Sequence, residues 1–155
     1  MRAAFSETLT GGAYPLDPSR GVQPLALDLK ASARGVVECA LGAPFEIRGH
    51  LRAEPPTTPA AALLPAAATV TGTMRFLVSA GLFYDLRLAA SDDTPACDKL
   101  ELRGARRFAR GDLVTSATTF VGMLLARGAV IGDVHLRFHV RDDVPSLFRS
   151  LRLGS

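Results

Sequence analysis

The sequence predicts an all-β protein: a small antiparallel barrel or barrel-like sandwich of about eight strands with a C-terminal helix. Three observations predict it. Apolar and polar residues alternate with a period of two along most of the chain. Short segments rich in glycine, proline and aspartate separate the alternating stretches. Helical periodicity is convincing only near the C-terminus. A barrel is slightly favoured over a sandwich, because closure removes exposed strand edges.

The clearest expected strands are FEIRGHLRA (45–53) and DVHLRFHVR (133–141), in which every second residue is apolar or glycine. Such alternation is typical of a strand with one buried and one solvated face. The other stretches are rich in Thr, Val, Leu and Phe, which favour strands. In chain order, the expected strands cover about residues 3–11, 25–33, 45–53, 68–78, 83–91, 99–109, 115–126 and 133–141.

A C-terminal helix is predicted over about 143–151. Asp142 or Asp143 provides an N-cap, and Pro145 falls in the first turn, where its missing N–H costs nothing. Apolar residues follow at helical spacing and form one stripe. The stripe consists of Val144, Leu147, Phe148 and Leu151.

The whole chain, 1–155, is expected to form a single domain. With 48% hydrophobic and 21% charged residues, it has the composition of a globular protein that can bury a core without a disulfide or metal. The expected core includes Phe45, Phe76, Phe83, Tyr84, Phe120, Met123 and Phe138. An eight-stranded barrel is either filled by such side chains or holds one small apolar ligand, and the sequence leaves both open.

Composition excludes several function classes. The net charge is +3, but the cations are interspersed, Trp is absent and aromatics make up 6%, so no nucleic-acid partner is expected. The longest apolar run, AAALLPAAATV, is too short to span a bilayer, and no secretory signal is visible. We therefore expect a cytoplasmic protein without stable membrane insertion. Cys39 and Cys97 could pair, although their spacing does not suggest a zinc site.

Charged side chains have mainly structural interpretations. Single carboxylates in the strands are expected to pair with basic residues on neighbouring strands. These are Glu7, Asp28, Glu38, Glu46, Asp85 and Glu101. The basic run of Arg103, Arg106, Arg107 and Arg110 is interpreted as a solvated strand edge and turn, with contact to an anionic lipid or carboxylate as the alternative.

Histidines and arginines on polar strand faces are the candidate ligand-binding residues. His135 and His139 would lie roughly 13 Å apart on a strand, and Arg137 between them would repel a cation, so no metal site is expected. If the polar faces lined a barrel lumen, Arg48, His50, His135 and Arg137 would form a ligand pocket. A solvated strand face is the alternative. No catalytic residue and no cofactor are predicted, since motifs such as GxSxG are missing.

Three stretches resemble a known family when taken together. They are FSETLTGGAYPL, the segment from TVTGTMRF through KLELRGARRF, and GDVHLRFHVRDDVPSLFRSLRL. Their order resembles the small β-rich accessory region found beside cholesterol-oxidase-like, glucose–methanol–choline-type flavoproteins of bacteria. Arg106 stands where that pattern has lysine, and the chain has no GxGxxG flavin fingerprint. The resemblance implies an accessory module in sterol or lipid oxidation, with an oxidoreductase as partner, rather than the oxidase itself.

Three functions follow as hypotheses. The main one is non-enzymatic binding of a lipid-like or other apolar small molecule, with an arginine or histidine holding its polar head. The second is a small barrel enzyme of the isomerase or cyclase type, which would need a buried ionisable residue; His50, Glu46 and Asp85 are the candidates. The third is a structural module that builds a homo-oligomer.

Overall fold

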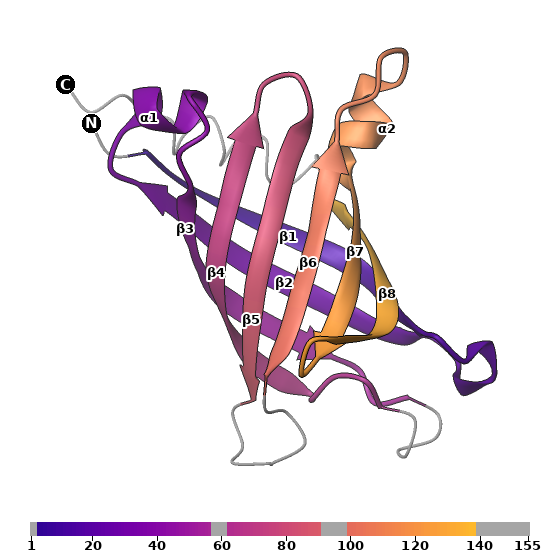
Figure 1. The fold of residues 1–155 in the computed structure, drawn as a ribbon. Coiled ribbons are helices and arrows are strands. Elements are labelled where there is room, and N and C mark those ends of the chain that lie inside the picture. The colour runs from indigo at the N-terminus through magenta and orange to yellow at the C-terminus, as the bar shows by residue number, and fades with distance from the viewer. Residues whose placement is uncertain (1–2, 57–61, 91–98, 139–155) are drawn as a thin grey trace.

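The protein is a closed barrel of eight antiparallel strands, as a computed structural model shows for residues 3–56, 62–90 and 99–138 (Figure 1). This confirms the predicted all-β barrel, whereas the predicted helix at 143–151 and Cys97 lie outside the described residues. The strands are β1 (Ala3–Pro15), β2 (Gln23–Ala33), β3 (Phe45–Ala53), β4 (Ala67–Leu77), β5 (Gly81–Ala90), β6 (Leu100–Arg107), β7 (Thr119–Ala126) and β8 (Ala129–Phe138).

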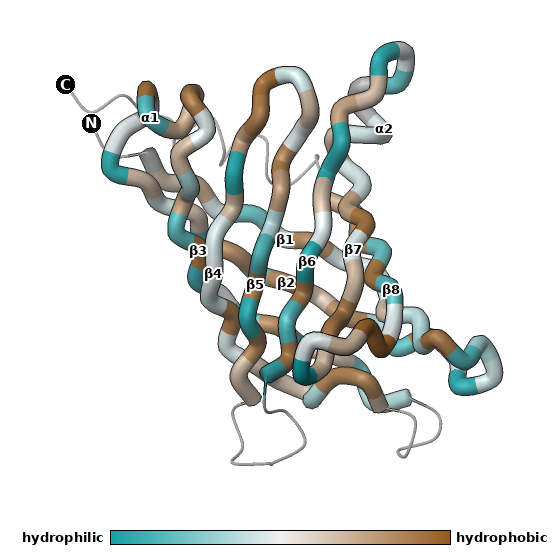
Figure 2. Tube along the Cα trace, viewed as in Figure 1, coloured by the Kyte–Doolittle hydropathy of each residue, from teal (hydrophilic) through white to brown (hydrophobic). Residues whose placement is uncertain are grey.

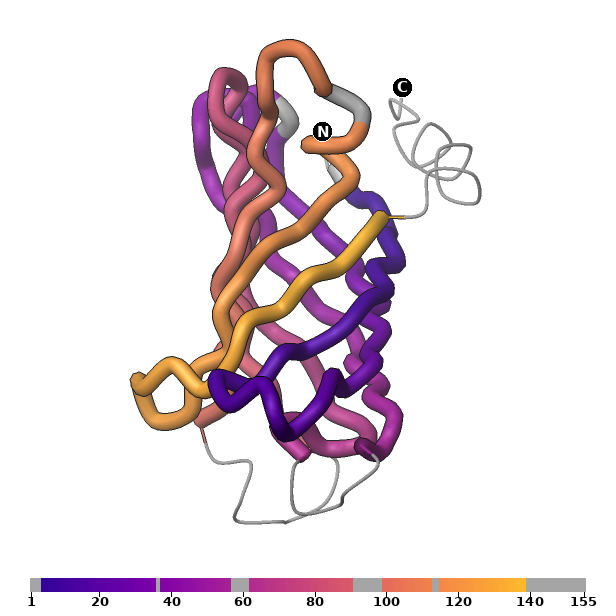
Figure 3. The backbone as a smooth tube through the Cα atoms, turned by 90° about the vertical axis from the view of Figure 1, so that its right-hand side faces the viewer, coloured from indigo at the N-terminus to yellow at the C-terminus, as the bar shows by residue number. Residues whose placement is uncertain are grey.

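Each strand pairs with the next one along the chain, and β1 pairs with β8 to close the ring. The closing register runs from Leu9 opposite Phe138 to Pro15 opposite Gly132. Figure 3 shows the yellow β8 lying beside the indigo β1, with the strands inclined to the barrel axis. Closure leaves none of the eight strands with an unpaired edge, which removes a common site of aggregation.

Alternation along the strands separates the inside of the barrel from the outside. On β8, Val134 and Leu136 are buried, whereas His135 and Arg137, which alternate with them, are exposed. Figure 2 shows the same alternation of hydrophobic and hydrophilic residues along several strands. The period-two prediction is therefore confirmed, and in a barrel the apolar face is the inner one.

Apolar side chains from every strand fill the middle of the barrel. Together they form one contiguous cluster of buried residues. A barrel of eight strands is just wide enough for such filling. The largest fully buried side chains are Phe120, Leu9, Leu27, Leu29, Ile47, Leu51, Met74, Leu86, Leu102, Leu124, Leu136 and Val70.

Two residues expected in the core point outward instead. Met123 is 45% exposed, and Phe83 lies partly exposed on the outer face of β5. Their chain neighbours Tyr84 and Leu124 take the inward positions and are buried. Because side chains alternate strictly along a strand, only one of two adjacent apolar residues can face the core.

A pair of glycines makes room for Phe120, the largest fully buried side chain. Gly104 on β6 lies opposite Gly122 on β7. A Cβ added at Gly104 would come within 2.5 Å of Cζ of Phe120, and one at Gly122 would come within 2.9 Å of Cε1 of the same ring. The ring thus occupies the space that two ordinary side chains would need.

Two short helices lie at one end of the barrel, which we call the helical end (Figure 1). They are α1 (Val36–Ala40), between β2 and β3, and α2 (Leu113–Thr118), between β6 and β7. The prediction of a strand from 115 is wrong for its first four residues, since β7 begins at Thr119. Asp112 explains the difference: its carboxylate accepts a hydrogen bond from the Thr115 N–H at 3.2 Å and caps α2.

At the opposite end of the barrel, which we call the Gln23 end, the Gln23 side chain makes a set of hydrogen bonds with the backbone. A 3-10 turn, η1 (Pro18–Arg20), links β1 and β2 there. The buried Gln23 amide donates to the carbonyls of Glu54 and Leu64 and accepts from the N–H groups of Leu63 and Leu64, at 3.0–3.1 Å. These bonds hold the buried Leu64 against the core at this end of the barrel.

Several predicted cross-strand ion pairs form on the outer surface. Arg52 lies 3.1 Å from Asp28, and Arg103 lies 3.5 Å from Asp85. All four side chains are substantially exposed, so each pair contributes at most about 1 kcal/mol to stability. Glu7 pairs with Arg106 inside the barrel rather than with a residue of a neighbouring strand, and Arg106 is buried rather than on the predicted solvated strand edge.

Candidate functional site

A buried polar cluster lies inside the barrel and consists of Glu7 on β1, Tyr84 on β5 and Arg106 on β6. These residues are 3%, 3% and 5% exposed. The Tyr84 hydroxyl donates to Oε1 of Glu7 at 2.7 Å. The Arg106 guanidinium donates through Nη2 to both Glu7 and the Tyr84 hydroxyl. Each member therefore contacts the other two.

Local alternation explains why these side chains face inward. Glu7 is two residues from the inward Leu9, and Tyr84 is two residues from the inward Leu86. Arg106 continues the inward row of Leu102 and Gly104. A polar side chain that points into the barrel cannot reach solvent through the barrel wall. The three inward polar side chains therefore form hydrogen bonds with one another.

Aromatic rings surround the guanidinium. Cζ of Arg106 lies 5.6 Å from the centroid of the Tyr84 ring and 5.1 Å from that of Phe138. The Tyr84 ring in turn meets the Phe120 ring edge-on, with the centroids 5.4 Å apart. Cation–π contacts of this kind gain strength when the cation is desolvated.

Burial and neighbouring charges shift the pKa values of Tyr84 and Arg106. Burial, reinforced by the negative charge of Glu7, raises the pKa of Tyr84 well above its usual value. Burial alone would lower the pKa of Arg106, but Glu7 and Tyr84 outweigh it and the net pKa is raised. Tyr84 is therefore a neutral phenol and Arg106 a cation at neutral pH.

One donor of the cluster has no acceptor. Nε of Arg106 is buried and makes no hydrogen bond with any residue that the structure describes. Leaving a buried donor unpaired costs about 1–3 kcal/mol, and more for a charged group. An oxygen atom placed against Nε would recover this free energy, which marks the position as a candidate binding point.

Partly exposed aromatic residues line the helical end, beyond the cluster. Phe5, Phe45 and Phe138 pack against the core without being fully covered. The rings of Phe5 and Phe45 meet edge-on at 5.6 Å. We call these three residues the aromatic rim. The helical end thus carries partly exposed aromatic side chains, one of which, Phe138, contacts the Arg106 guanidinium.

The four residues predicted to share a ligand pocket lie in two separate places on the outer surface. Arg48 and His50 are exposed on β3, and His135 and Arg137 are exposed on β8. Strands β1 and β2 lie between the two pairs. His135 packs edge-on against Tyr14 at 5.2 Å. The structure does not bring the four together, and ligand binding by either pair stays a prediction.

The candidates for a buried catalytic residue are also exposed. His50, Glu46 and Asp85 all point away from the interior. Sequence reasoning missed Glu7 and Arg106, which are the buried charges. The alternation along each strand could have identified them, since Arg106 occupies the same alternate positions of β6 as the buried Leu100 and Leu102.

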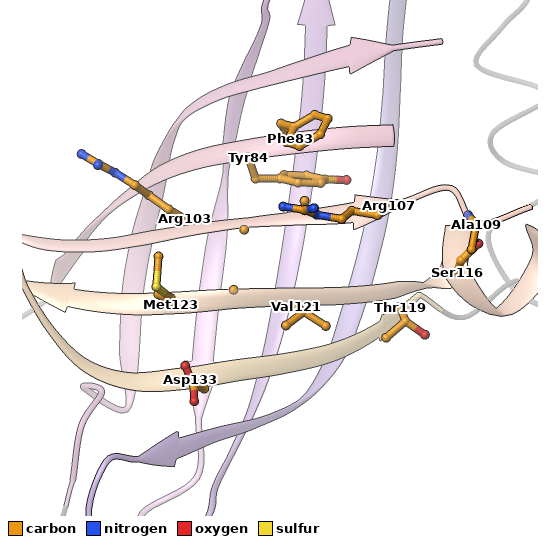
Figure 4. Close-up of a pocket in the computed structure, with 13 residues that line it drawn as sticks. Phe83, Tyr84, Arg103, Arg107, Ala109, Ser116, Thr119, Val121, Met123 and Asp133 are labelled. Atoms are coloured by element: carbon orange, nitrogen blue, oxygen red, sulfur yellow. Dashed lines mark hydrogen bonds between the residues drawn. The ribbon is translucent and has the colours of Figure 1, made fainter. Parts of the chain in front are cut away.

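A groove of about 800 Å³ lies on the outer face of β5–β8, below α2. Figure 4 shows Arg103 and Arg107 on β6, Val121 and Met123 on β7, and Asp133 on β8. Phe83 and Ala105 add to its mainly apolar lining. The groove is open: Val121 is 50% exposed and Met123 is 45% exposed.

Among the described residues, no three His, Cys, Asp or Glu side chains lie close enough to hold a metal ion. The described part of the chain also contains no helix with the length and apolar character needed to cross a membrane. Comparison with known proteins found no matching family model, no similar curated protein and no similar solved structure.

Proposed function

We propose that this barrel is a non-enzymatic binding protein for a lipid-like small molecule with one polar oxygen. The observation that carries this proposal is the buried Arg106 near the aromatic rim, whose Nε has no acceptor among the described residues. The polar oxygen would accept a hydrogen bond from Nε. The apolar body would contact Phe5, Phe45 and Phe138, since the middle of the barrel is already filled.

The charge of the cluster favours a neutral head group. Glu7 already neutralises Arg106 at hydrogen-bond distance, so a carboxylate at Nε would add a second negative charge beside Glu7. A hydroxyl or ketone oxygen accepts the same hydrogen bond without this repulsion. Each Å² of apolar ligand surface removed from water at the rim contributes about 25 cal/mol. A sterol-like alcohol or ketone therefore fits better than a fatty acid.

An accessory role in sterol or lipid oxidation agrees with this ligand class. The ligand would enter head first, because Arg106 lies deeper than the rim. Its body would then face the helical end, where a partner oxidoreductase could cover it. The partner oxidoreductase is part of this proposal because the sequence resembles an accessory region found beside such enzymes.

Catalysis by the same cluster is the second candidate, since a carboxylate and a phenol lie side by side in the barrel. Their hydrogen-bonding capacity is directed at each other: the phenol proton goes to Glu7, and both Glu7 oxygens accept bonds. An acid or base that is committed in this way has no free proton or lone pair directed at a substrate. This arrangement favours binding over turnover.

The test is titration with a fluorescent sterol and, separately, a fluorescent fatty acid. Arg106→Lys keeps a cation near Glu7 but removes Nε, and we expect it to weaken sterol binding about tenfold or more. The matched control is Arg107→Lys, which alters the adjacent, exposed arginine and should leave affinity within about twofold.

Two results would overturn the proposal. The first is failure of the folded wild-type protein to bind any sterol or fatty acid, together with a ligand-free mass by native mass spectrometry. The second is equal loss of affinity in both variants, which would place the ligand away from Arg106. Turnover of an unsaturated ketone that disappears in Glu7→Gln would favour the enzyme instead.

A further inference from the structure

The outer groove contains an apolar strip with nothing packed on it in the described chain. The strip consists of Phe83 on β5, Ala105 on β6, and Val121 and Met123 on β7. Phe83, Ala105 and Val121 stand side by side in register across three strands. Val121 and Met123 remain about half exposed, although side chains of this kind usually avoid water when they cluster.

Two opposite charges without partners border this strip. Arg107 and Asp133 make no ion pair with any described residue. By contrast, Arg103 is held by Asp85 at 3.5 Å and Glu101 at 2.9 Å. Arg107 and Asp133 are thus a cation and an anion at the border of the strip that have no ion-pair partner among the described residues.

The strand register places these two charges symmetrically about Val121. Ala105, Val121 and His135 lie in one row across β6, β7 and β8. Arg107 is two residues after Ala105, and Asp133 is two residues before His135. Because β6 and β8 run in the same direction, the two charges lie on opposite sides of the row, with Val121 midway between them.

From this geometry we propose that the strip is a homodimer interface, with a second copy of this chain as its occupant. A twofold axis through Val121 brings Val121 of one copy against Val121 of the other. It also places Arg107 of each copy against Asp133 of the other, which forms two equivalent ion pairs. An isologous interface requires this self-complementarity, in which the same patch supplies both partners of each contact. The inference does not depend on ligand binding at the helical end.

The experiment is sedimentation velocity of the full chain over a concentration series, with Val121→Glu as the main variant. Two buried glutamates facing each other at the axis should raise the dimer dissociation constant by about a hundredfold or more. Val130→Glu is the matched control, because Val130 is 39% exposed on the neighbouring strand and lies outside the strip. It should leave the dissociation constant unchanged.

Charge reversal tests the pairing itself. Arg107→Asp and Asp133→Arg should each weaken the dimer about tenfold, since each places like charges against each other. The double variant restores opposite charges and should recover most of the wild-type affinity. These residues are exposed, so circular dichroism should show all variants folded.

A monomer at every concentration up to about 100 µM would overturn the inference, since protein interfaces of standard size bind far more tightly. A dimer that Val121→Glu leaves intact would also overturn it. If the protein is monomeric and Val121→Glu lowers its melting temperature, the strip is covered by the chain's own residues, and the second copy is ruled out.

Discussion

The Glu7–Arg106 pair offers a quantitative test of how this barrel tolerates buried charge. Glu7→Gln leaves Arg106 as a cation that is 5% exposed without an anionic partner. Breaking a buried ion pair from one side typically costs about 3–5 kcal/mol. Arg106→Met leaves the Glu7 carboxylate uncompensated and should cost a similar amount.

The double variant, Glu7→Gln with Arg106→Met, removes both charges together. The amide oxygen introduced by Glu7→Gln can still accept from the Tyr84 hydroxyl, and the methionine side chain fills much of the arginine volume among the aromatic rings. We therefore expect the double variant to lose about 1–3 kcal/mol, well below the sum of the single losses. The resulting coupling free energy is at least about 3 kcal/mol.

Urea unfolding at neutral pH, followed by circular dichroism, measures all four free energies of unfolding. A small barrel of this kind is expected to unfold in one cooperative step, which permits the comparison. Additive single losses, with coupling below about 0.5 kcal/mol, would refute the reasoning. Such a result would mean that water reaches the cluster and screens the two charges.

Two further predictions concern the same interior. Since burial raises the pKa of Tyr84, unfolded chains lose its proton above about pH 10 while the native state keeps it. Stability is thus complete below that pH and falls as pH rises; Tyr84→Phe should flatten the fall, whereas Tyr14→Phe, at an exposed tyrosine, should not. Gly104→Ala places a Cβ 2.5 Å from the Phe120 ring and should cost about 1–3 kcal/mol by urea unfolding. Adding Phe120→Leu should recover part of that loss, and strict additivity would contradict the packing argument.

Local sequence determined most of the strands and the face that each turns inward. The alternation in 45–53 and 133–138 needs no tertiary information, because a strand's side chains point to opposite sides by covalent geometry. Phe83 and Tyr84 show one limit of this signal: for two adjacent apolar residues, hydrophobicity alone does not indicate which one is buried. Only their alternation with Leu82, Leu86 and Leu88 along β5 assigns Tyr84 to the interior.

Helix α2 shows a second limit. Residues 115–118 are rich in threonine and favour a strand, yet Asp112 caps a helical turn at the point where β6 must reverse into β7. The geometry of that connection decides the local structure, since propensity is worth only tenths of a kcal/mol per residue.

Only the tertiary structure decided where the buried charges meet. Glu7 and Arg106 are 99 residues apart, and Tyr84 and Glu7 are 77 apart. Glu7 and Arg106 each look like an ordinary surface residue in their own segments. The alternation along each strand places these side chains inside the barrel. Their height along the barrel axis depends on the register of all eight strands. The fold class thus follows from local alternation. The candidate site depends on the closed barrel, because the pairing of its strands sets which inward residues lie at the same height along the axis.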